Sequence, residues 1–221
     1  MVVQRRVLPI FLALCGAASP GLARPEPAPS APVAPGVVYG EIPITTSAPA
    51  ALPFFRAGRL KALNFELVAA AEQLERALAL DPGFAQAMAW LGKCDPGPAG
   101  LAQVEKAASL AQSYGEAERL SIEALLAERR GDGERLRALR RKLADLAPRD
   151  WLSQYQLGVQ SFYDHKSQAA ILYFNRAVQL RPDLAEPYMY LAYLLALQGN
   201  AEAGVAAARK LVELQIGRAH V

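Results

Sequence analysis

The sequence has very few side chains suited to covalent or metal chemistry, since its 221 residues include only 2 cysteines and 2 histidines. Cys15 and His220 lie near the two ends of the chain, whereas Cys94 and His165 lie far apart in its interior. A metal site needs three or four ligands, which so few cysteines and histidines do not supply. The glycine pair around Asp132 lacks the lysine of a phosphate loop. We therefore expect no catalysis, no metal and no cofactor.

The sequence also lacks a strong charge of one sign, because its formal net charge is only +3 at pH 7. Such a balance gives no positive field to attract nucleic acid, and we expect no nucleic-acid partner. Basic residues gather only within residues 129–142, where acidic residues are interleaved with them. This mixture is typical of a solvated helix face with local ion pairs, and an anionic lipid or polymer partner is the alternative.

A period of 34 residues is the clearest positive signal. Pro148 and Pro182 are separated by 34 residues, and Pro82 closes an earlier apolar stretch of the same kind. In the stretch that ends at Pro182, the residues at the characteristic offsets are Leu157, Gly158, Ala170, Phe174 and Ala177. This stretch resembles a tetratricopeptide repeat, a helix hairpin of about 34 residues in which small residues stand where the two helices cross.

The resemblance implies an all-α fold, a right-handed superhelical solenoid of antiparallel helix hairpins that each bury an apolar face against their neighbours. The predicted hairpins cover residues 51–84, 85–116, 117–150, 151–184 and 185–215. The second of these is shortened, because the sequence Asp95–Pro98 makes a rigid turn. No alternation of the strand type competes with the helical periodicity.

The N-terminus has the features of a secretory signal peptide over residues 1–23, with two arginines, an apolar stretch and small residues before a cut after Ala23. An alternative is a lipoprotein lipidated at Cys15, because residues 12–16 resemble a lipobox, although a leucine precedes the cysteine where a small residue is usual. Residues 24–50 are rich in proline and alanine, which predicts a semi-rigid polyproline linker. We therefore expect an exported bacterial protein, periplasmic or extracellular, or outer-membrane-associated if it is a lipoprotein.

The C-terminus departs from the repeat. The period predicts a proline at position 216, but Ile216 stands there and begins the string Ile-Gly-Arg-Ala-His-Val. A widely used sequencing adapter gives this string when it is translated, so we expect residues 216–221 to be a non-native tail and the natural protein to continue. A last helix with Leu211 and Leu214 and no polar cap favours self-association through that end.

The resemblance also implies that the first helix of each hairpin lines a concave groove. Residues expected to face this groove are Ser121, Leu125, Tyr155, Val159, Phe162, Met189 and Tyr193. Residues four apart share a helix face, and the 34-residue period stacks them on adjacent helices. Phe162 is equally compatible with the core, and Tyr188, Tyr190 and Leu191 are expected to pack between helices. Tyr155 and Val159 replace the basic residue and asparagine with which some chaperone adaptors of this family hold a C-terminal carboxylate.

Taken together, these patterns predict a non-catalytic scaffold that binds a peptide or protein segment in the concave groove. Two alternatives remain open. One is a membrane-tethered assembly lipoprotein, in contact with a membrane only through Cys15. The other is a regulatory segment of a larger enzyme or receptor whose catalytic part follows residue 215.

Cleavage after Ala23 and lipidation at Cys15 give different mature proteins. We expect N-terminal sequencing of the exported protein to begin at Arg24, and labelled fatty acid not to be incorporated. The variant Cys15→Ala should be exported normally. Fatty-acid labelling that disappears in Cys15→Ala would instead establish the lipoprotein.

Overall fold

The computed structural model describes residues 41–219, with side chains to residue 216, and every regular element in this range is helical. The α-helices are α1 (Leu52–Leu63), α2 (Leu67–Leu80), α3 (Ala85–Cys94), α4 (Pro98–Leu110), α5 (Glu116–Arg130), α6 (Gly133–Leu146), α7 (Trp151–Tyr163), α8 (Ser167–Leu180), α9 (Ala185–Leu197) and α10 (Ala201–Ala219). Short 3-10 helices, η3 (Pro49–Ala51) and η4 (Ala111–Ser113), precede α1 and follow α4. The predicted all-α fold is confirmed. The predicted signal peptide lies outside the described residues.

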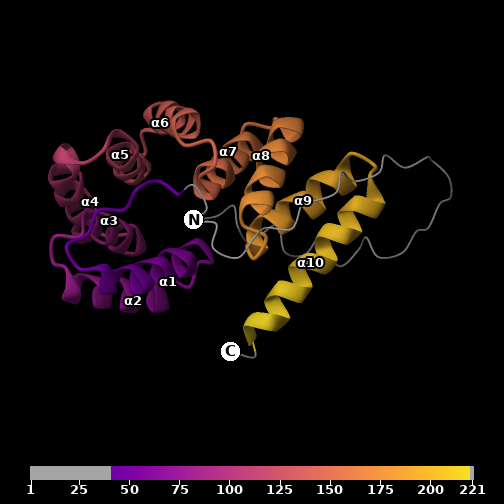
Figure 1. Ribbon diagram of the computed structural model, residues 1–221. Helices are drawn as coiled ribbons and strands as arrows, with labels where there is room; N and C mark the ends of the chain where they lie inside the picture. The colour runs from indigo at the N-terminus through magenta and orange to yellow at the C-terminus, as the bar shows by residue number, and fades with distance from the viewer. Residues whose placement is uncertain (1–40, 220–221) are drawn as a thin grey trace. The chain divides into compact units, whose positions relative to one another are not determined.

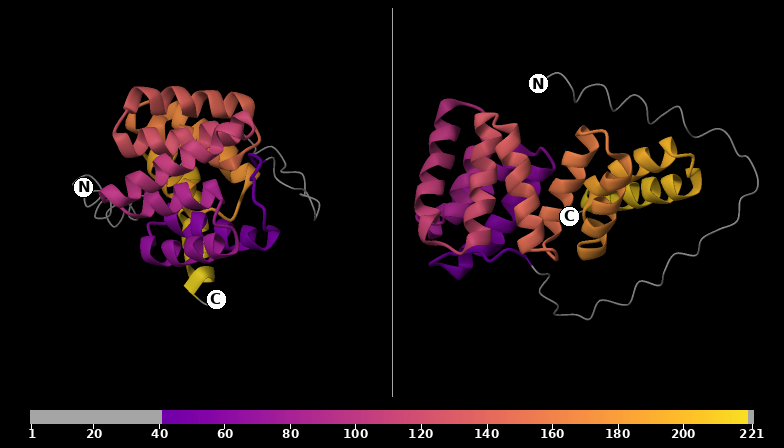
Figure 2. Two further views of the ribbon diagram at one scale, coloured as in Figure 1. Left: turned by 90° about the vertical axis from the view of Figure 1, so that its left-hand side faces the viewer. Right: turned by 90° about the horizontal axis from the view of Figure 1, so that it is seen from above.

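Consecutive helices pair as hairpins, α1 with α2, α3 with α4, and so on to α9 with α10 (Figure 1). Each hairpin packs on the next, and the views in Figure 2 show successive helices side by side. The first helices of neighbouring hairpins also touch, α1 against α3 and α3 against α5. The result is a TPR-like helical array. We call the surface formed by α1, α3, α5, α7 and α9 the first-helix face.

A residue without a side chain allows the helices of a hairpin to approach closely. A Cβ atom added at Gly158 would lie 2.6 Å from the ring of Phe174, and Gly58 is equally crowded in the first hairpin. At Gly92 an added Cβ would collide with the backbone carbonyl oxygen of Gly100. Interior packing of this density leaves no room for an extra methyl group. These three hairpins thus need glycine at the crossing for a steric reason, whereas α5 and α9 carry Ala124 and Ala192 at the equivalent position.

Aromatic rings join one hairpin to the next. Phe55 of α1 and Phe84, just before α3, are fully buried with ring centroids 4.9 Å apart. Phe174 of α8 stacks on Tyr190 of α9, with centroids 4.7 Å apart and planes 7° from parallel. Leu191 is buried beside this stack, which agrees with the prediction that it packs between helices. The first contact joins α1 to the junction before α3, and the second joins α8 to α9.

The last helix, α10, continues through residue 216 to Ala219, so the helix does not end where the adapter-like string begins. Three of its apolar side chains, Val205, Val212 and Ile216, are about half exposed, at 49%, 52% and 55%. Within residues 41–219, no helix combines the length and the apolar character that crossing a membrane requires.

The close approach at Gly92 makes a stability prediction. We expect Gly92→Ala to lower the free energy of unfolding by about 1–3 kcal/mol, because the methyl group meets backbone and cannot be accommodated by a rotamer change. Gly133→Ala in α6 is the matched control, since its Cβ would meet only the flexible end of Arg137, at 3.5 Å. Urea denaturation measures both, and equal stabilities of the two variants would contradict the packing argument.

Candidate functional site

The segment Glu41–Ala48 runs without helical structure along the first-helix face before the chain enters η3 and α1 (Figure 1, indigo). The sequence assigns this segment to the linker over residues 24–50, and in the structure residues 41–48 of that range lie against the array. The reason lies in local composition, because this part has a single proline before position 49 and carries isoleucine and threonine side chains that find partners on the array.

Backbone N–H groups of the segment donate to three carboxylates of the array. The three bonds are Ile42 N to Asp150 Oδ1 (3.3 Å), Thr45 N to Glu118 Oε1 (2.8 Å) and Ser47 N to Asp81 Oδ2 (2.8 Å). Asp150 immediately precedes α7, Glu118 lies in the first turn of α5, and Asp81 directly follows α2. The segment therefore runs from the fourth hairpin back toward the first. We refer to Asp81, Glu118 and Asp150 as the three carboxylates.

The threonine hydroxyl groups strengthen this attachment. Thr45 Oγ1 donates to Glu118 Oε2 at 2.6 Å, so Glu118 accepts from both the backbone and the side chain of one residue. Thr46 Oγ1 donates to Asp81 Oδ2, also at 2.6 Å. Hydrogen bonds to ionised acceptors are shorter and stronger than those between neutral groups. Two adjacent hydroxyl residues thus fix the segment to two different hairpins.

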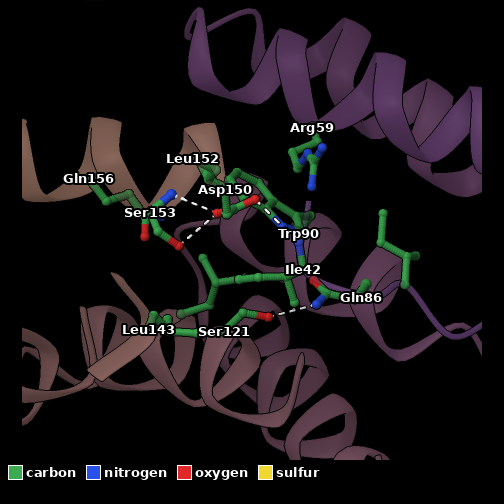
Figure 3. Close-up of a pocket in the computed structure, with 12 residues that line it drawn as sticks. Ile42, Arg59, Gln86, Trp90, Ser121, Leu143, Asp150, Leu152, Ser153 and Gln156 are labelled. Carbon is green, nitrogen blue, oxygen red and sulfur yellow. Dashed lines mark hydrogen bonds between the residues drawn. The ribbon is translucent and has the colours of Figure 1, made fainter. Parts of the chain in front are cut away.

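Ile42 and Ile44 are the apolar contacts of the segment. Ile42 packs against a buried cluster of α5 and α6, made of Leu120, Ala124, Ala127, Leu139 and Leu143. The cavity that remains beside the two isoleucines is about 20 Å³ and is walled by residues that include Trp90, Ser121 and Asp150 (Figure 3). A space of this size holds about one water molecule. The segment therefore fills this part of the first-helix face almost completely.

Glu41 starts the segment with a charged contact. Its Oε1 atom accepts from Arg59 Nη2 at 3.2 Å and from Trp151 Nε1 at 3.1 Å. Arg59 is only 6% exposed, and its guanidinium group lies 5.3 Å from the centre of the Trp151 ring. Burial raises the pKa of Glu41, but Arg59 and the Trp151 hydrogen bond outweigh burial, so that the pKa is below its ordinary value.

The three carboxylates differ in how well the site tolerates their charge. Burial raises the pKa of Glu118 and of Asp150 above the ordinary range, despite the hydrogen bonds that each accepts. For Asp81, burial acts in the same direction, but hydrogen bonds from Thr46 and Ser47 outweigh it and lower the pKa. The site therefore disfavours the charged forms of Glu118 and Asp150, whereas it favours that of Asp81.

Two of the predicted groove residues lie next to the bound segment. Ser121 and Leu125, both on α5, line the small cavity beside Ile42. Ser121 Oγ accepts from Gln86 Nε2 at 2.6 Å, and Leu125 is buried, with 3% of its surface exposed. Both residues therefore lie beside the chain's own segment.

Tyr155 does not lie open on the first-helix face. Its side chain is buried, with 9% exposed, and its ring centroid is 6.1 Å from that of Phe174. Burial raises its pKa well above the ordinary value. The expectation that Tyr155 offers an exposed aromatic surface is therefore corrected, because the large ring completes the packing of α7 on α8.

The remaining predicted residues are half-buried on α7 and α9. They are Val159, Phe162, Met189 and Tyr193. Phe162 lies edge-on to Tyr190 and Tyr193, with centroids 5.0 Å and 6.0 Å away. Phe162 thus belongs both to the contact between the last two hairpins and to the partly exposed surface beside it.

Sequence reasoning missed Glu41 and the three carboxylates. A signal for two of them was present, since Asp81 and Asp150 each lie at the junction between hairpins, directly before or after the helix boundary. An aspartate at such a junction is ordinarily a helix cap, and Asp150 does accept from Ser153 N at 2.7 Å. Only the folded chain brings its other oxygen to Ile42.

Other polar groups of the described residues are used structurally. The basic run pairs with acidic side chains of neighbouring helices, for example Arg140 with Glu128 at 3.5 Å and Lys142 with Glu116 at 2.6 Å. Cys94 is buried and free, and burial raises the pKa of its thiol. Among residues 41–219, no group of three or more histidine, cysteine or acidic side chains is placed to hold a metal ion.

No family model and no curated protein matches this chain. Solved structures of MamA are similar to it at low sequence identity. One crystal structure of MamA is 16% identical with a TM-score of 0.47, covering 74% of this chain and 97% of that chain. MamA from Desulfovibrio magneticus RS-1 is 13% identical with a TM-score of 0.44, covering 77% of this chain and 97% of that one.

The two hydrogen bonds that Glu118 accepts from Thr45 lead to a prediction about how the segment is held. We expect Glu118→Ala to speed hydrogen exchange at the Thr45 amide by about tenfold or more, because two hydrogen bonds to a carboxylate are lost. Glu118→Gln should retain most of the protection, since its amide oxygen still accepts and no buried charge remains. NMR measures the exchange rate of the Thr45 amide in each variant. A rate in Glu118→Ala equal to that of the unmodified protein would show that Glu118 does not hold the segment.

Proposed function

We propose that the protein is a non-catalytic scaffold that binds an extended segment of a partner protein on its first-helix face. The observation that carries this proposal is the way in which that face holds Glu41–Ala48. Backbone N–H groups, which every polypeptide offers, donate to carboxylates at fixed positions on different hairpins. Recognition of main-chain groups, with pockets for alternate side chains, is a general mode of peptide binding.

The C-terminal part of the first-helix face offers a different kind of surface. Val159 and Phe162 of α7 and Met189 and Tyr193 of α9 are half-buried, so part of each apolar side chain meets solvent. Aromatic and methionine side chains provide large contact areas at interfaces. We propose that these residues receive apolar side chains of the partner segment.

We also propose that the scaffold acts outside the cytoplasm. This part of the proposal depends on residues 1–23 alone, which carry the basic, apolar and small-residue regions of an export signal. A partner met after export would be a protein of the same compartment. The labelling of Cys15 described above decides whether the scaffold is also attached to a membrane.

A photo-crosslinking amino acid tests the proposed surface. Placed at Tyr193 in the exported protein, it should give a discrete crosslinked product with a partner protein in living cells. The matched control carries the same amino acid at Leu172, which is 49% exposed on α8, a second helix of a hairpin. The control should give no such product, because second helices do not form the first-helix face.

Products of equal yield from positions 193 and 172 would contradict the proposal, since they would indicate contact without preference for the first-helix face. A product from position 172 alone would contradict it as well, and would transfer the interaction to the second helices. Circular dichroism of both variants checks that the helical array is unchanged.

A further inference from the structure

We propose that Glu41–Ala48 is a built-in competitor, which occupies the first-helix face from the fourth hairpin to the first and is displaced by a partner segment of the same chemistry. The inference rests on the proposed function and adds two points to it. It assigns a regulatory role to a stretch of this chain, and it states which kind of peptide the face recognises.

The contacts define the peptide that fits. The face uses the backbone N–H groups of residues 42, 45 and 47, and Pro43 lies at an intervening position, where its missing N–H costs no bond to the three carboxylates. Side-chain selectivity comes from an acidic residue at the start, apolar residues at 42 and 44, and adjacent hydroxyl residues at 45 and 46. An extended partner segment with an acidic residue, two β-branched apolar residues and two adjacent hydroxyl residues would make the same bonds.

The docked segment is held in a way that permits release. Its strongest contacts are hydrogen bonds to carboxylates, and water solvates a carboxylate well when the segment leaves. Glu118 is 1% exposed, and burial disfavours the charged form that accepts the two hydrogen bonds from Thr45. The apolar contacts of the segment come mainly from the two isoleucines.

The attachment point explains why a weakly held segment stays docked. Ala48 is followed directly by η3, and Ala51 at its end is fully buried. The segment is therefore tethered within a few residues of its own site. A short tether of this kind gives an effective concentration in the millimolar range, so even a weak interaction fills the site until a tighter competitor arrives. Apparent affinity for the competitor is reduced by the fraction of sites that are occupied.

The experiment measures binding of a labelled synthetic peptide, Gly-Glu-Ile-Pro-Ile-Thr-Thr-Ser-Ala-Pro, to the full chain by fluorescence anisotropy. In the variant Thr45→Ala/Thr46→Ala, the chain's own segment loses both hydroxyl bonds, and the peptide should bind at least about tenfold more tightly than it binds the unmodified chain. Thr45→Ser/Thr46→Ser is the matched control, because serine keeps both hydroxyl groups, and it should bind the peptide as weakly as the unmodified chain does.

A second change tests the receptor side. Glu118→Ala added to the double alanine variant should abolish the gain in peptide affinity, because the free peptide uses the same carboxylate. If the double alanine variant fails to fold, as judged by circular dichroism, Ser47→Pro replaces it. Proline removes the N–H that Asp81 accepts while keeping an extended backbone, and the same gain is expected.

Equal peptide affinity in all folded variants would overturn the inference, since the segment would then be a permanent part of the array. A dimer that forms by exchange of segments between two chains, detected by analytical ultracentrifugation, would overturn it too, because the occupant would then be a second copy. Neither result bears on crosslinking at Tyr193, so failure of this inference is distinguishable from failure of the proposed function.

Discussion

The close approach of two helices at a residue without a side chain is the constraint on which this structure depends. Gly158 lies against the ring of Phe174, and Gly92 lies against the backbone at Gly100. In the first two hairpins, which are closed in this way at Gly58 and Gly92, the first helix also meets the first helix of the next hairpin, as α1 meets α3 and α3 meets α5. The part of the first-helix face formed by α1, α3 and α5 thus depends on a local steric rule.

That face is polar where it holds the chain's own segment and apolar where α7 and α9 meet. Asp150, Glu118 and Asp81 accept from the N–H groups of residues 42, 45 and 47 of the extended segment, whereas Phe162 and Tyr193 supply partly exposed rings. Hydrogen bonds to carboxylates fix which residue of a peptide lies at each point of the face, and aromatic rings provide a large contact area. The two halves of the face are therefore suited to different parts of one extended ligand.

Much of the fold was predictable, because it depends on residues that interact within one hairpin or with the next. The pattern around Gly158 and Phe174 predicts a close helix pair, and the structure has that pair. The site was less predictable. Ser121 and Leu125 lie on the expected side of α5, but Tyr155 is buried, since the periodicity that places a residue on a helix face does not state how far its ring turns into the neighbouring helix.

The sequence by itself determined a helical array with a 34-residue period, because apolar periodicity and small residues at crossings act over short separations in the chain. Only the tertiary structure decided what occupies the first-helix face. Glu41 and Trp151 are 110 positions apart, and Ile42 and Asp150 are 108 apart. No pattern of neighbouring residues predicts either hydrogen bond. The two partners come within bonding distance only after the intervening hairpins have stacked.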